Sequence, residues 1–275
     1  MFAFLTAAAA LLGQTDQTAE AYRVQRERWQ KYYGEIAAQY EIRWGQAPGD
    51  ELHLNTRPLL SYFNPVGGGQ THGSLFVWTR QGRPEIAGAI WSKQSGDQRR
   101  VIHSFHSLSL EPLQATRSGT VFWSPTQPGI EQVLIPSVSP PAGTGAQRLL
   151  QMRSIAKDFS ATTTRDKAER QLRLLPQPIY HYDPSDRIEH DGGLFLWLED
   201  WDPELLMLIE TTATSDGPKW HVGFARFTNL PVTARYKDTR IWSFQPSDVE
   251  PSQGGLLHRY ISVHGVEVLP AHRDE

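Results

Sequence analysis

The stretch GSLFVWTRQGRPEIAGAIWSK, residues Gly73–Lys93, has a close counterpart in GGLFLWLEDWDPELLMLIETT, residues Gly192–Thr212. The two stretches lie 119 residues apart and align without a gap as far as Ser124 and Ser243. Fourteen of the 52 aligned positions are identical, whereas average composition leads to about three by chance. Because the identities far exceed chance, we interpret the sequence as an internal tandem duplication, and a repeat of this length governs the whole architecture.

The similarity extends upstream of this alignment. Tyr33, Ile36, Ala37 and Tyr40 lie over Met152, Ile155, Ala156 and Phe159 at the same offset. The predicted organisation is a signal peptide or disordered start over residues 1–19, a first copy over 20–124, a linker rich in Pro, Gly and Ser over 125–144, a second copy over 145–243, and a C-terminal strand and tail over 244–275.

Each copy is predicted to begin with a helix. Trp29, Tyr33, Ile36 and Tyr40 recur at helical spacing, and Leu149, Met152, Ile155 and Phe159 do the same. The β-branched run 162–164 is expected to end the second helix.

Strands are predicted after each helix. In the first copy they cover residues 75–78, 85–93 and 100–110, with turns at 81–84 and 95–97, and the second copy repeats this pattern. The predicted fold class is therefore α+β, with each copy an N-terminal helix followed by an antiparallel β-meander and the two copies packed as a pseudo-twofold pair.

Composition excludes several functions. The net charge is −3, so the chain has no basic surface for nucleic acid. It has no cysteine, which excludes disulfides, thiolate catalysis and zinc held by cysteine.

The apolar run at residues 2–13 is too short to cross a bilayer, which needs roughly 20 residues. It is typical of the central region of a signal peptide, although no Lys or Arg precedes it, and the alternative is a buried N-terminal helix. We expect no transmembrane span and an exported protein of the periplasm or cell envelope.

Two resemblances add to this interpretation. The LFxW…PE element, the HSLS segment 106–109, the RLLPQPIYxY segment 173–182 and the DGGLFLW segment 191–197 together resemble a family of duplicated exported proteins of planctomycete bacteria. That resemblance implies export and transfers no function. The alternation of strands with Gly-x-Pro and Gly-Asp turns is similar to the opening of flavin-binding split barrels, but this chain lacks their basic and hydroxyl cluster for the flavin phosphate.

Six residues are candidates for a binding site. His103 and His106 lie three apart on a predicted strand, so they face opposite sides and cannot readily share a metal ion. Arg226 lies on an otherwise apolar strand face, where it could bind an anion or emerge at the strand end. Glu85 and Glu204 follow a proline at equivalent positions, and they could form an acid–base pair or merely mark a turn. His221 is the sixth candidate.

The polar loop 180–193 offers oxygen ligands but does not match a calcium-binding loop. No motif of a hydrolase, zinc protease, P-loop or dinucleotide-binding protein occurs, so we expect no catalytic residue, no metal site and no cofactor. The preferred hypothesis is a non-catalytic binding or interaction protein, with its ligand or envelope partner between the two copies. The alternative is an enzyme or cofactor binder, for example a split-barrel flavoprotein.

Overall fold

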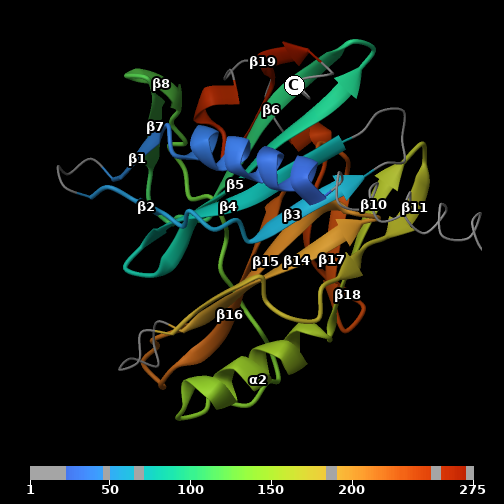
Figure 1. Ribbon diagram of the computed structural model, residues 1–275. Helices are drawn as coiled ribbons and strands as arrows, with labels where there is room; N and C mark the ends of the chain where they lie inside the picture. Colours follow the sequence, from blue (N-terminus) through green and yellow to red (C-terminus); the bar gives the residue numbers. More distant parts are fainter. Residues whose placement is uncertain (1–22, 46–49, 65–70, 184–190, 249–254, 271–275) are drawn as a thin grey trace, which may run out of the picture.

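The computed structural model of the chain describes residues 23–45, 50–64, 71–183, 191–248 and 255–270 (Figure 1). The predicted α+β class is wrong, because strands make up 54% of the structure and helices 15%. The described residues contain two α-helices, over residues 23–37 and at α2 (Gly145–Ala156). All the strand pairs among them are antiparallel, so the protein is an assembly of antiparallel sheets rather than a pair of helix-on-sheet units.

The first large sheet has six strands. Its long hairpin strands are paired in the order β4, β5, β6, and β19 adds to the free edge of β6. The strands of this sheet are β2 (His53–Leu54), β3 (Leu60–Asn64), β4 (Thr71–Arg80), β5 (Arg83–Ser95), β6 (Gln98–Ser107) and β19 (Tyr260–Pro270). A segment from near the C-terminus therefore completes a sheet of the first half.

The second large sheet has the same plan. Its central strands pair in the order β14, β15, β16, and the edge strand beside β16 comes from the predicted linker. Its strands are β12 (Arg173–Leu174), β13 (Tyr180–Tyr182), β14 (Gly192–Glu199), β15 (Asp202–Thr212), β16 (Lys219–Arg226) and β9 (Val133–Leu134).

Two smaller sheets flank the large ones. The first consists of β1 (Tyr40–Trp44), β7 (Leu113–Arg117) and β8 (Thr120–Trp123). The second consists of β10 (Phe159–Arg165), β11 (Ala168–Gln171), β17 (Val232–Tyr236) and β18 (Thr239–Phe244). Figure 1 shows the helix over 23–37, in blue, and α2 on opposite sides of the sheets.

Three hydrophobic cores hold the sheets together. One core joins β1, β7 and β8 with the first large sheet and includes Trp78, and another joins the second small sheet with the second large sheet and includes Trp197. The third lies between the two large sheets, where Leu75 and Val77 meet Leu194 and other leucines of the second sheet. The long strands are thus buried on both faces, which explains their continuous apolar sequences.

Both predicted helices extend too far at their C-terminal ends. Tyr40, which was predicted to be helical, is the first residue of β1, and Phe159 is the first residue of β10. The β-branched residues 162–164, which were predicted to end the second helix, lie within β10. Both aromatic side chains are buried in the same cores as the preceding helical turns, so the apolar periodicity continues across the helix end.

Strand positions in the two halves correspond closely. The bounds of β7 and β17 differ by 119 residues at each end, and a register shift follows Trp78 in β4 and Trp197 in β14. No helix among the described residues has the length and apolar character that a membrane crossing requires.

Candidate functional site

Charged side chains lie at the margin of the space between the two large sheets. Along β5 the residues with odd numbers face this space, and along β15 those with even numbers do so, because successive strand residues point to opposite faces. Apolar residues occupy the centre of each strand. Arg83 and Glu85 therefore lie at one end of β5 and Glu210 at the far end of β15, all on the face where the sheets meet.

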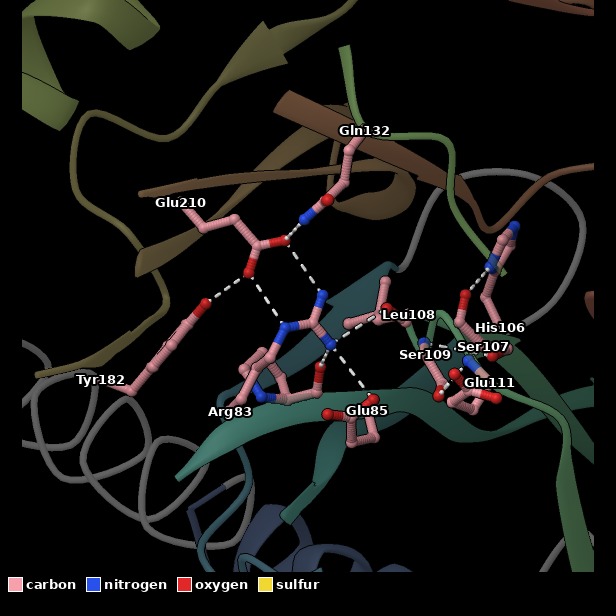
Figure 2. Close-up of polar contacts among 11 residues, drawn as sticks. Arg83, Glu85, His106, Ser107, Leu108, Ser109, Glu111, Gln132, Tyr182 and Glu210 are labelled. Carbon is pink, nitrogen blue, oxygen red and sulfur yellow. Dashed lines mark hydrogen bonds and ion pairs between the residues drawn. The ribbon is translucent and has the colours of Figure 1, made fainter. Parts of the chain in front are cut away.

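Arg83 forms the centre of a hydrogen-bonded network across the two halves (Figure 2). Its Nε and Nη2 donate to Oε2 and Oε1 of Glu210 at 2.9 and 3.0 Å, and its Nη1 donates to Oε2 of Glu85 at 3.1 Å. The hydroxyl of Tyr182 and the amide of Gln132 each donate to Glu210 at 2.6 Å. Glu210 thus receives four hydrogen bonds, and its partners come from β5, β13 and the segment before β9.

The network is satisfied within the protein. Although burial raises the pKa of Glu210, the Arg83 guanidinium and the hydrogen bonds hold it below its usual value. For Glu85 burial has the larger effect and raises the pKa in spite of Arg83. Since the donors and acceptors are already paired, this network holds the two halves together and leaves little capacity for a ligand.

Arg226 lies at the base of a cavity of about 520 Å³. The side chain is buried, and its guanidinium carbon lies 3.8 Å from the centre of the Phe244 ring and 4.1 Å from that of Tyr260. Nη1 donates to the carbonyl of Thr228 at 2.6 Å and to Oδ1 of Asn229 at 2.9 Å. Among the described residues no carboxylate lies within ion-pair distance of Arg226, and burial lowers its pKa to about 10. The group therefore stays charged at neutral pH, and no described carboxylate pairs with it.

The cavity wall is polar and basic. It combines β6, β16 and β18 with the segment between β8 and β9, the segment before β19 and the first residue of β19. Its residues are His106, Thr126, Gln127, Glu131, Arg226, Arg240, Ile241, Trp242, Ser243, Phe244, Asp248, Leu257, His258, Arg259 and Tyr260. Of its two acidic residues, Glu131 lies 3.6 Å from Arg259 and Asp248 accepts the backbone N–H of Gln245. An anion in this cavity would meet three arginines.

The structure brings together only two of the residues singled out from the sequence. His106 and Arg226 line the same cavity, whereas His103 lies on the opposite face of β6 and contacts the Tyr40 hydroxyl through Nδ1 at 2.5 Å. His221 lies on β16, where it pairs with Leu134 of the edge strand.

Glu85 and Glu204 belong to separate environments. Glu85 is part of the Arg83 network, and Glu204 lines a different cavity. The hypothesis of an acid–base pair has no support in this arrangement.

Sequence reasoning missed several polar residues. Arg83, Glu210 and Tyr182 were not considered, and neither was Arg148, whose Nε donates to the fully buried Asp191 at 2.5 Å and thereby anchors α2 to the start of β14. One signal was available, because the repeat pairs Arg83 with Asp202 and Trp91 with Glu210. At these two positions the aligned copies carry side chains of different charge, so the two halves differ in their contacts there.

The structure describes the two ends of the polar loop 180–193. Residues 184–190 lie outside the described part of the chain, while Asp183 and Asp191 both pair with Arg148. Within the ranges that the structure describes, no group of three or more His, Asp or Glu is arranged for a metal ion.

Comparisons with known proteins identify no family. No family model matches the chain, and no curated protein matches it. Among solved structures, it is similar to the GH36 alpha-galactosidases AgaA, in complex with raffinose, and AgaB, both from Geobacillus stearothermophilus, at 11% and 10% identity. The TM-scores are 0.17 and 0.16, and each alignment covers 82% of this chain but only 26% of the enzyme. The chain thus spans about a quarter of their length, and scores this low establish neither a shared fold nor a function.

Proposed function

We propose that the protein is a non-catalytic binding protein whose ligand is a small anion, a carboxylate or a phosphate compound, bound at Arg226. The observation that carries this proposal is a buried guanidinium that opens onto a cavity and has no carboxylate partner among the described residues. Burying an uncompensated charge costs free energy, so an anionic ligand would stabilise the folded protein.

The orientation of Arg226 favours recognition of a planar or tetrahedral anion. Two aromatic rings contact the guanidinium through its faces, and one terminal nitrogen is held by Thr228 and Asn229. The Nε and Nη2 groups have no hydrogen-bond partner within the described ranges. An arginine fixed in this way is suited to bidentate hydrogen bonding with a carboxylate or phosphate.

Binding fits this cavity better than acid–base catalysis does. His106 is the candidate base that β6 contributes to the cavity wall, and burial lowers its pKa to about 3. Its Nδ1 donates to the carbonyl of Ser107 at 2.8 Å. A histidine with so low a pKa is a weak base near neutral pH.

The position of the cavity agrees with a site between the two halves. Its wall takes His106 from the first half, Arg226 and Phe244 from the second, and Tyr260 from the C-terminal strand. We also propose that the halves descend from one duplicated unit, which the constant offset of strands and register shifts supports. Export stays a prediction from residues 2–13, which lie outside the described part of the chain.

The test is calorimetric titration of the full chain with phosphate, citrate and flavin mononucleotide. We expect at least one of these anions to bind, and Arg226→Gln to weaken that binding by about tenfold or more. Arg100→Gln, which removes an exposed arginine of β6, is the matched control and should leave binding unchanged.

Two results would contradict the proposal. If no anion binds the wild-type chain, Arg226 serves the fold alone. If Arg226→Gln and Arg100→Gln lose binding equally, the attraction is a general surface effect. Preference for flavin mononucleotide over phosphate would favour the flavin-binding alternative at the same residues.

A further inference from the structure

A second cavity, of about 450 Å³, lies between the large sheets at the end opposite to the Arg83 network. Asp202 and Glu204 reach it from the start of β15, Trp91 from β5 and Tyr62 from β3. Tyr260 lines both this cavity and the one at Arg226. Asp202, Glu204 and Trp91 line this cavity and take no part in the proposed anion site.

Every side chain of the Arg83 network has a counterpart in this second cavity. Four counterparts follow from the offset of 119 residues, namely Arg83 with Asp202, Glu85 with Glu204, Trp91 with Glu210, and Leu108 with Phe227. Two follow from strand pairing. Tyr62 corresponds to Tyr182, because they pair with the equivalent glycines Gly73 and Gly192. Ser262 of the edge strand β19 corresponds to Gln132, which directly precedes the edge strand β9.

The local backbone at the two glutamates is also the same. Leu108 donates its N–H to the carbonyl of Glu85, and Phe227 donates to the carbonyl of Glu204, both at 2.8 Å. Ser109 and Thr228, which are also 119 residues apart, each lower the pKa of the neighbouring glutamate, Glu85 and Glu204 respectively. The two places therefore share one framework and differ in the side chains they carry.

The two places differ in charge, because the arginine of the Arg83 network is an aspartate in the second cavity. Where the filled network has the Arg83 guanidinium, the cavity has the carboxylate of Asp202, and where the network has Glu210, the cavity has Trp91. Glu204 remains. Only 7% of it is exposed, and its buried Oε2 has no hydrogen-bond partner among the residues that the structure describes. Its counterpart Glu85 accepts a hydrogen bond from Nη1 of Arg83.

The basic residues around the cavity do not supply this missing cation. Arg165 and Arg170 pair with Glu199, at 3.6 and 3.2 Å. Lys93 is exposed at the outer end of β5. The pKa of Glu204 is raised to about 8, mainly by burial and also by Glu199 and Asp202, whereas Thr228 and Arg165 act to lower it. Within the described ranges, Glu204 therefore forms no ion pair with a positive side chain.

We propose that this cavity binds a small organic cation, a guanidinium or alkylammonium compound, which takes the place that the Arg83 guanidinium fills in the other half. Asp202 supplies a carboxylate, and Glu204 supplies a second one when the bound cation displaces its proton. The rings of Trp91 and Tyr62 offer aromatic faces to the cation. The cavity is large enough for a ligand of several carbon atoms beyond the charged group.

The test uses agmatine, which carries both a guanidinium and a primary ammonium group, in calorimetric titrations of the full chain at low salt. We expect saturable binding to the wild type, and Glu204→Gln should weaken it by about tenfold or more. The matched control is Glu85→Gln, at the counterpart position in the filled network, and it should leave the affinity unchanged. Circular dichroism checks that each variant is folded.

A second design removes the cavity instead of its charge. The double variant with Asp202→Arg and Trp91→Glu installs the side chains of the filled network, so it should abolish agmatine binding while the protein stays folded. Absence of saturable binding to the wild type would overturn the proposal. So would a Glu204→Gln protein that binds as well as wild type, or equal losses for Glu204→Gln and Glu85→Gln.

Discussion

Arg83 and Glu210 meet through two parallel hydrogen bonds, although they lie on different sheets and are 127 residues apart in the chain. The contact joins the first half of the molecule to the second at the margin of their shared core. Glu210 is almost fully buried, so its carboxylate depends on this partner. The ion pair therefore helps to hold the two halves of the molecule together.

Removing one partner of this pair should strongly destabilise the protein. Arg83→Met leaves Glu210 buried without its cation, and we expect a loss of about 3–5 kcal/mol in the free energy of unfolding. The double variant with Glu210→Gln should lose less than the sum of the single variants. Urea unfolding measures each value, and the exposed pair Lys31–Glu35 provides a control whose removal should change little. Additive losses would mean that the pair does not act as a unit.

The repeated tryptophans should be equally important to the two outer cores. Trp78 and Trp197 are each 1% exposed, and Trp78→Ala or Trp197→Ala should cost about 3–5 kcal/mol because each leaves a large cavity. Trp201 is 58% exposed and serves as the control. Thermal and urea unfolding should show little change for Trp201→Ala. A loss well below 1 kcal/mol at both buried positions would contradict the assignment of these cores.

Glu204 should make stability fall as the pH rises. Its pKa is about 8 in the folded protein and about 4.5 in the unfolded chain, so between these values the folded state holds a proton that the unfolded state has released. The contribution is fully favourable below pH 4.5 and is lost as the pH passes 8, at roughly 1 kcal/mol per pH unit. Unfolding between pH 5 and 9 should show a flatter profile for Glu204→Gln than for wild type. Parallel profiles would contradict the raised pKa.

The buried histidines should act in the opposite direction. Burial lowers the pKa of His72, His103 and His106 to about 3. As the pH falls below about 6.5, the unfolded chain binds protons that the folded chain does not, so stability decreases between pH 6.5 and 3. Nitrogen-15 spectra of the imidazole rings should show all three neutral at pH 5. A ring that titrates between pH 5 and 7 would contradict its buried position.

Much of the β structure could be predicted from the sequence, because strand signals are local. The predicted strand at 75–78 falls inside β4, and the predicted strand at 85–93 falls inside β5. The fold class was wrong because the short strands carry little signal of their own. β2, β9 and β12 have two residues each, and they exist only through pairing with neighbours that are distant in sequence.

The site was predictable only in part, for a related reason. Arg226 could be noticed because it interrupts an apolar strand, and His106 because histidine is uncommon in one. The network at Arg83 depends on contacts between the two halves, and no spacing within one half indicates them. The counterpart cavity at Glu204 is likewise lined by residues of both halves, so its sequence signal is equally dispersed.

The edge strand β19 has a consequence for synthesis of the chain. It pairs with β6 along nine residue positions, yet it follows the entire second half in sequence. While the ribosome is still making that second half, the hydrogen-bonding edge of β6 stands bare, and a bare strand edge can pair with another nascent chain. The first sheet can close only after translation has passed residue 270, so its maturation is expected to depend on protection of that edge in the meantime.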